Sequence, residues 1–249
     1  MKASFLLLVL AAAISAQIKK PEPPAVKTPF AESLQAVVVT TDSSTATSGT
    51  ARLFERKTAK ATWKATDKKI PIVVGRSGLA WAQDSAPEAA TAFKKEGDGK
   101  SPAGMFPLTY AFGRVDIENS KIKYLTLAEF SECVDDVNSN HYNKIVNRMQ
   151  VGAFDWKSSE KMMEITPEYD LGVFVAYNSY PVVRSNGSCI FLHVWKDANT
   201  PTSGCTAMAI ADLDRIVNWL DAKKNPYLVQ LTTDDYAKYA KAWNLPILK

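Results

Sequence analysis

The sequence has little of the residues that bind metals, because its 249 residues include only two histidines and three cysteines. A structural zinc site needs four ligands, usually with pairs of them close together in the chain. The histidines at 141 and 193 and the cysteines at 133, 189 and 205 show no such spacing. We therefore expect neither a metal nor another cofactor.

The sequence also lacks a dense basic segment. Its 30 Lys and Arg residues nearly balance 26 Asp and Glu residues, which leaves a net charge of +4, and the lysines are scattered without interleaved aromatic residues. This pattern speaks against a nucleic-acid partner. A mildly basic protein is still attracted to anionic polymers such as cell walls, through a field that salt screens.

No apolar run is long enough to cross a membrane. The longest, at residues 3–16, follows a lysine, ends in small residues and is shorter than the roughly 20 residues that a spanning helix needs. A membrane anchor is the alternative, but these features and the polar, proline-rich stretch that follows favour a cleaved signal peptide at residues 1–16. We therefore expect a secreted or periplasmic protein that starts at Gln17, with no transmembrane anchor.

The rest of the chain predicts a single, mainly β domain with a few helices. Prolines at residues 17–33 indicate an extended linker, and the folded unit is expected at 34–231. A helical tail is expected at 232–249. Short β-branched runs separated by turn residues predict strands at 34–40, 50–56, 70–74, 171–177, 189–194 and 227–231. An apolar stripe predicts a helix at 209–220, shortly after Cys205. The free backbone N–H groups at the start of this helix would lie near that cysteine.

Three cysteines in an oxidising compartment allow one disulfide and one remaining thiol. Cys133 and Cys189 are the natural pair if Cys205 stays free. The alternatives are two separate buried thiols, or a bond between Cys189 and Cys205 that would abolish thiol chemistry. The sequence by itself leaves these three arrangements open.

His193 and Cys205 are the residues most able to carry out chemistry. A thiol becomes a strong nucleophile when a neighbour stabilises its thiolate, and an imidazole is the usual partner. His193 ends a predicted strand, and the loop at 199–204 has room to bring Cys205 back to it. Gly204 permits a tight turn directly before the cysteine.

The motifs FLHVW at residues 191–195 and PTSGC at 201–205 resemble the signature of the L,D-transpeptidase catalytic domain, the YkuD-like family of bacterial wall enzymes. They are most similar to a secreted branch of that family. The segment at 94–106, which contains GDGKSPAGMF, resembles the substrate loop of the family, and CVDD at 133–136 with Tyr142 and Asn143 also matches the branch. The resemblance covers roughly residues 34–231.

This resemblance implies a β-sandwich or open barrel that forms an acyl-thioester with a peptidoglycan stem peptide. It implies Cys205 as the nucleophile, His193 as its base, and backbone N–H groups around Ser203 and Gly204 as donors to the oxyanion. The implied substrate-binding residues lie in the upstream loop and around the histidine and cysteine: Ser101, Pro102, Gly104, Trp195 and Thr202. An amine from a second stem peptide would then accept the acyl group.

The chain departs from the better-known family members at two positions. Ser203 stands where those members have histidine, and Ala207 stands where they have arginine or asparagine. The interval between His193 and Thr202 is also shorter. Two other functions are therefore kept: a cysteine hydrolase, such as a peptidase or carboxypeptidase, and a non-catalytic wall-binding module. Papain-type proteolysis is disfavoured because the local cysteine signature of that class is absent.

Other polar residues have simpler interpretations. Asp135 and Asp136 are adjacent and predict a solvated turn more readily than a pair of cooperating carboxylates. His141 is expected at or near the surface, and Trp195 either lines the site or fills the core. Asn186 begins the glycosylation motif Asn-Gly-Ser in a predicted turn. We expect a monomer whose partner is a stem peptide or a related cell-wall polymer.

Overall fold

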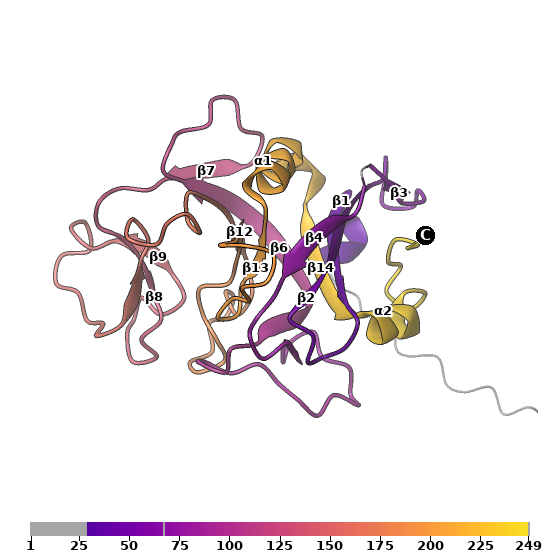
Figure 1. The fold of residues 1–249 in the computed structure, drawn as a ribbon, viewed down its shortest axis with the longest axis horizontal. Coiled ribbons are helices and arrows are strands. Elements are labelled where there is room, and N and C mark those ends of the chain that lie inside the picture. The colour runs from indigo at the N-terminus through magenta and orange to yellow at the C-terminus, as the bar shows by residue number, and fades with distance from the viewer. Residues whose placement is uncertain (1–28, 67, 249) are drawn as a thin grey trace, which may run out of the picture.

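A computed structural model describes residues 29–66 and 68–248 of the chain (Figure 1). The predicted signal peptide and most of the predicted linker lie outside the described residues. Within the described part, no helix is both long and apolar enough to cross a membrane. The strands are β1 (Gln35–Thr41), β2 (Ser48–Glu55), β3 (Lys64–Ala65), β4 (Ile70–Val73), β5 (Leu79–Trp81), β6 (Ser101–Gly113), β7 (Lys123–Thr126), β8 (Ser131–Val134), β9 (Ile145–Asn147), β10 (Ser159–Lys161), β11 (Leu171–Val175), β12 (Phe191–Val194), β13 (Thr206–Met208) and β14 (Tyr227–Thr232).

The main sheet closes into a barrel. Its hydrogen-bonded order is β1-β14-β6-β11-β12-β13-β4-β2, and β2 pairs with β1 to complete the circuit. Most neighbours are antiparallel, but β1 with β14 and β12 with β13 are parallel. The barrel is filled by apolar side chains from every strand of the circuit, for example Val39, Leu192 and Leu228. The prediction of a mainly β, single-domain fold is confirmed, and six of its strands are those that the sequence predicts.

Helix α1 (Ile210–Trp219) lies against β11 and β12 and covers one side of the barrel (Figure 1). It buries Leu213, Ile216 and Val217, as an amphipathic stripe predicts. Ile210, which the sequence places in the same stripe, is 53% exposed because it begins the helix. Strand β13 separates this helix from Cys205 by about 10 Å of extended chain. The expectation that the helix N-terminus lies near the cysteine is therefore wrong.

Both ends of the described chain pack into the domain. The 3-10 helix η1 (Pro29–Glu32) carries Phe30, which is 1% exposed and stacks on Trp63. The linker predicted up to residue 33 therefore ends earlier. A second 3-10 helix, η2 (Ala222–Lys224), leads into β14. Helix α2 (Thr233–Tyr239) then packs on β14 and β1, and its Tyr236 and Tyr239 belong to the barrel core.

A second, smaller sheet stands beside the barrel, on the side opposite β3 and α2 (Figure 1). It contains β8 flanked antiparallel by β9 and β10. A disulfide between Cys133 of β8 and Cys189, in the segment before β12, ties it to the barrel. A separate apolar cluster fills the junction, and this cluster includes Phe112, Phe191 and Cys205. The small sheet therefore reaches the part of the barrel that carries the candidate nucleophile.

Candidate active site

Strand β12 fixes His193 in a buried position. The residue pairs with Gly172 of β11 and with Ala207 of β13, and it is 6% exposed. Nδ1 of the ring lies 2.7 Å from the carbonyl oxygen of Val194, which can only accept a hydrogen bond, so Nδ1 carries the proton. Nε2 of the neutral ring therefore presents a lone pair. Burial lowers the pKa of His193 to about 4, against smaller opposing effects of the Val194 carbonyl and Glu168.

The turn before Cys205 is held by hydroxyl groups. The hydroxyls of Ser101 and Thr202 both donate to the carbonyl oxygen of Cys205, at 2.8 and 2.7 Å. Gly204 has a φ of +153°, and a Cβ atom there would lie 3.0 Å from the carbonyl oxygen of Lys100. Glycine is needed at this position for both reasons. The main chain at Cys205 is consequently fixed between the loop and strand β6.

The cysteine pattern is now resolved. Cys133 and Cys189 form the disulfide, which confirms that pairing over the two alternatives, and Cys205 is a free thiol. Its sulfur accepts a hydrogen bond from the Phe191 amide and donates to the Cys189 carbonyl, both at 3.3 Å. The side chain is 7% exposed, and burial raises the pKa of the Cys205 thiol well above its usual range. The resting thiol is therefore protonated.

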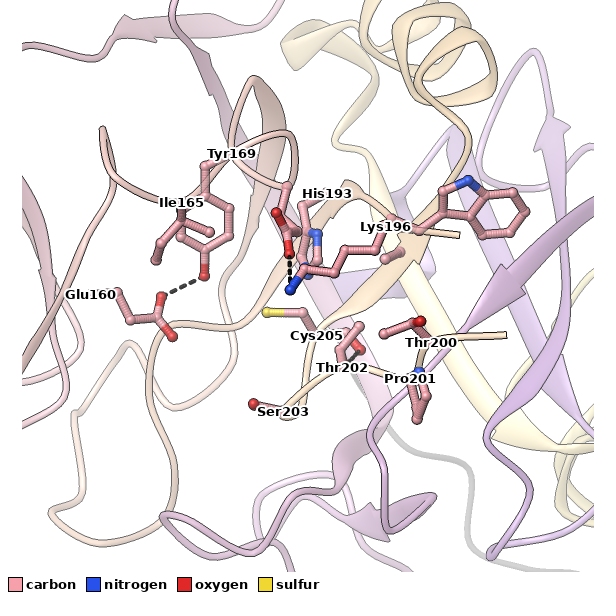
Figure 2. Close-up of a pocket in the computed structure, with 13 residues that line it drawn as sticks. Glu160, Ile165, Tyr169, His193, Lys196, Thr200, Pro201, Thr202, Ser203 and Cys205 are labelled. Atoms are coloured by element: carbon pink, nitrogen blue, oxygen red, sulfur yellow. Dashed lines mark hydrogen bonds and ion pairs between the residues drawn. The ribbon is translucent and has the colours of Figure 1, made fainter. Parts of the chain in front are cut away.

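Two cavities meet at this thiol. The first, of about 270 Å³, is lined by residues of the barrel and of the segment at 160–169, including His193, Trp195 and Thr202. The second, of about 300 Å³, lies toward the loop at 94–97 and the disulfide. Cys205, Ser203 and Glu160 line both cavities. Figure 2 shows His193 and Cys205 on one side of the first cavity, with the sulfur directed toward Tyr169 and Glu160 on the other.

The predicted substrate loop needs a correction. Ser101, Pro102 and Gly104 are buried within β6 and line neither of these cavities. A Cβ atom at Gly104 would lie 2.8 Å from the Ser85 side chain, so close packing explains that glycine. Ser101 supports the site from below by holding the Cys205 carbonyl. The residues of this loop that do face the second cavity are Lys94, Glu96 and Gly97.

The other predicted residues fall at different places around the site. Trp195, Thr202 and Ser203 line the first cavity, and so does Ala207. Asp136 accepts main-chain hydrogen bonds from Asn138 and Lys157 in a turn, while Asp135 lines the second cavity. His141 packs its ring against Trp156, outside both cavities. Asn186 bonds to Gln83 beside a separate groove of about 690 Å³.

Sequence reasoning missed Glu160 and Tyr169. Tyr169 is buried, its hydroxyl donates to Glu160 Oε2 at 2.5 Å, and its ring meets the His193 ring edge-on at 5.5 Å. Glu168 and Lys196, which form an ion pair of 3.5 Å at the first cavity, were also missed. Glu160 lies in a short stretch of charged residues that looks like solvated surface, and only the three-dimensional pairing of the small sheet brings it to Cys205.

No curated protein and no solved structure matches the chain. One family model does, the YkuD L,D-transpeptidase catalytic domain, over residues 42–230. That span contains β2 to β13, both cavities and the first four of the six residues of β14, including His193 and Cys205. The chain therefore belongs to the family of L,D-transpeptidase catalytic domains.

Proposed function

We propose that this protein is a secreted cysteine acyltransferase that forms a thioester between Cys205 and a peptidoglycan stem peptide. The observation that carries the proposal is a free thiol at the junction of two cavities, one of which is also lined by His193. The family membership supplies the substrate class. The disulfide supports an oxidising compartment, in agreement with a signal peptide.

In the proposed acylation, His193 takes the thiol proton at Nε2 while the sulfur attacks the peptide carbonyl carbon. Burial favours the neutral forms of both groups, so the resting pair is thiol and imidazole rather than an ion pair. Proton transfer then accompanies the attack, as general-base catalysis. Because the thiol donates to the Cys189 carbonyl at rest, that hydrogen bond has to break before the proton can pass to the imidazole.

The oxyanion formed by this attack requires hydrogen-bond donors at the turn. The Gly204 amide already donates to the Thr202 hydroxyl at 3.1 Å, so the amides of Ser203 and Cys205 are the better donors. His193 next returns its proton to the leaving amine. The C–N bond breaks, a terminal amino acid leaves, and the acyl group stays on the sulfur as a thioester.

The thioester then reacts with an amine or with water. An amine acceptor from a second stem peptide gives a crosslink, and water gives a shortened peptide. The two cavities favour transfer, because they give the acyl donor and the acceptor separate approaches to one sulfur. Trp195 and Thr202 are proposed to contact the donor from the first cavity.

Incubation of purified protein with muropeptides, followed by mass spectrometry, tests the proposal. We expect crosslinked dimers from the wild type and none from Cys205→Ala. Ser44→Ala is the matched control, because Ser44 is exposed and lines neither cavity. Shortened stems without dimers would identify a hydrolase, and binding without any product would identify a wall-binding module. Equal products from the wild type and Cys205→Ala would refute the role of the cysteine.

A further inference from the structure

Glu160 is an acidic residue of the small sheet that lies opposite the proposed nucleophile, Cys205. It is the middle residue of β10 and lines both cavities at their junction, together with Cys205 and Ser203. Its Oε2 accepts the Tyr169 hydroxyl. In Figure 2 the Glu160 carboxyl and the Cys205 sulfur face each other across the first cavity. A group at this position can reach a molecule that approaches the sulfur from either side.

Strand pairing, a disulfide and hydrogen bonds fix the position of Glu160 relative to the Cys205 sulfur. Glu160 pairs with Cys133 across the ladder between β10 and β8. Cys133 is bonded to Cys189, whose carbonyl oxygen accepts the Cys205 thiol proton. Tyr169 supplies a second route, since its hydroxyl meets Glu160 and its ring meets His193. The small sheet therefore places one carboxyl group against the reaction centre with few free torsions.

The second cavity has the polarity that an ammonium group requires. Glu96, Asp135 and Glu160 line it, and Oδ1 of Asp135 is a buried acceptor without a hydrogen-bond donor in the described chain. An N–H donor from a ligand would satisfy that oxygen. The cations at this cavity are Lys94, which is 3% exposed and paired with Asp98 at 2.8 Å, and Arg76 on an exposed turn. The Asp98 carboxylate largely offsets the charge of Lys94.

We propose that the second cavity admits the acceptor as an alkyl ammonium and that Glu160 removes the proton that makes it a nucleophile. This inference rests on the proposed function, since it concerns the fate of the thioester on Cys205. It divides the proton transfers between two residues: His193 serves the acyl donor and the sulfur at the first cavity, and Glu160 takes the first proton of the acceptor at the second. Tyr169 is a positioning residue that holds the carboxyl group.

The transfer step moves two protons from the acceptor nitrogen. The ammonium gives one proton to Glu160 and becomes a neutral amine, which attacks the thioester carbonyl carbon. A C–N bond forms, and the nitrogen loses a second proton to His193 as the C–S bond breaks. Cys205 leaves as a thiolate and takes that proton back from His193. Glu160 releases its proton to water in the cavity, so the net products are an amide, a thiol and one proton.

The environment of Glu160 suits this role. Desolvation raises its pKa to about 8, with contributions from Asp135 and Glu96 and against the hydrogen bond from Tyr169. An alkyl ammonium has a pKa near 10.4 and an ordinary glutamate one of about 4.3, so the shift brings donor and acceptor of the proton much closer together. Only the carboxylate can accept the proton. With a pKa of about 8, roughly one molecule in ten carries it at pH 7, and this fraction takes up the proton more readily than an ordinary carboxylate would.

The experiment separates acylation from transfer in Glu160→Gln, which keeps the size of the side chain and an oxygen to accept the Tyr169 hydroxyl. A muropeptide donor is added, and the thioester is measured by the intact mass of the protein. The acyl-enzyme is then mixed with one of two amines near neutral pH. Nα-acetyl-lysine offers an ammonium that must lose a proton, whereas hydroxylamine is already unprotonated. Glu164→Gln, an exposed glutamate on the same segment, is the control.

We expect Glu160→Gln to form the thioester at close to the wild-type rate and to react normally with hydroxylamine. Transfer to Nα-acetyl-lysine should fall about 100-fold or more, and it should recover as the pH rises toward the pKa of that amine. Equal losses with both amines, a loss of thioester formation, or no loss at all would overturn the inference. Absence of a thioester in the wild type would instead reject the proposed function itself. Glu164→Gln should match the wild type throughout.

Discussion

The Cys205 thiol lies between a wall made by the barrel and a wall made by the small sheet. In the barrel wall, β12 and β13 are parallel neighbours inside a closed ladder, and their side chains are buried. The opposite wall depends on three-residue strand pairings, one disulfide and hydrogen bonds between side chains such as Tyr169 and Glu160. Backbone pairing thus fixes one wall, and side-chain chemistry fixes the other.

The difference between the two walls indicates which side of the active site tolerates substitutions. Replacing a residue of the barrel wall disturbs a core that extends through every strand of the circuit. Replacing a residue of the small sheet alters a local polar network and leaves the barrel closed. Substitutions in the small sheet are therefore expected to leave the position of the nucleophile unchanged and to alter the acceptor side of the site. The predictions below test this division, beginning with the largest expected effect.

The barrel wall should control acylation. His193→Gln removes the group proposed to deprotonate Cys205, so the rate of thioester formation should fall about 10²- to 10⁴-fold. His141→Gln is the control, since His141 packs on Trp156 away from both cavities. Stopped reactions analysed by intact mass give the rate. An unchanged rate in His193→Gln would remove the histidine from the mechanism.

The small sheet should depend on its disulfide much more than the barrel does. The double variant Cys133→Ala/Cys189→Ala opens a loop of 56 residues, and the chain-entropy model puts the loss of unfolding free energy at about 4 kcal/mol. Hydrogen exchange should accelerate mainly at residues 131–161. Leu228→Ala is the comparison, because Leu228 is fully buried in the barrel and its truncation costs about 2–5 kcal/mol and loosens the barrel strands. Identical exchange patterns in the two variants would contradict the division.

The two walls also differ in how well the sequence predicts them. Strands of the barrel such as β1 and β14 carry apolar and β-branched residues over an ordinary strand length, so the prediction places them within two residues. Strand β6 was missed because Pro102, Gly104 and Pro107 resemble a turn. Its partners change along its length, from β5 to β14 to β11, which accommodates these residues in a long strand.

Local sequence motifs were sufficient to predict the active-site residues only in the barrel wall. His193, Gly204 and Cys205 lie within one short segment whose glycine and strand pattern can be read directly. Glu160 and Tyr169 belong to no such segment. Strand β10 has three residues and no alternation of apolar and polar side chains, so a local pattern cannot reveal it. Their contribution depends on tertiary contacts with residues far away in the chain.

The free energy of unfolding should fall in acid because of His193, a residue of the barrel wall. The pKa of His193 is about 4 in the folded protein and about 6.5 when unfolded, so the unfolded chain binds an extra proton between these values. The contribution is fully present above pH 6.5 and is lost as the pH falls toward 4, by about 3 kcal/mol. Urea unfolding of the wild type and His193→Gln at several pH values measures it. Parallel pH curves for the two proteins would refute the assignment.

The smallest expected effect has the opposite sign, and it lies in the small sheet. The pKa of Glu160 is raised to about 8, so this carboxyl favours folding at low pH and opposes it as the pH rises above about 4.5. Glu160→Gln should therefore increase the free energy of unfolding near neutral pH, by about 1–2 kcal/mol after allowance for solvent around the side chain.

Glu132→Gln is the matched control for that gain, because Glu132 belongs to the same small sheet and is buried. It accepts hydrogen bonds from Trp156 and Ser159 at 2.7 Å and pairs with Arg148 at 3.1 Å. Losing its charge should destabilise the protein by about 1–3 kcal/mol. A residue whose removal stabilises the fold is retained for activity rather than for structure. If both variants lose stability in urea unfolding, Glu160 is a structural carboxylate like Glu132, and the small sheet does not keep it for catalysis.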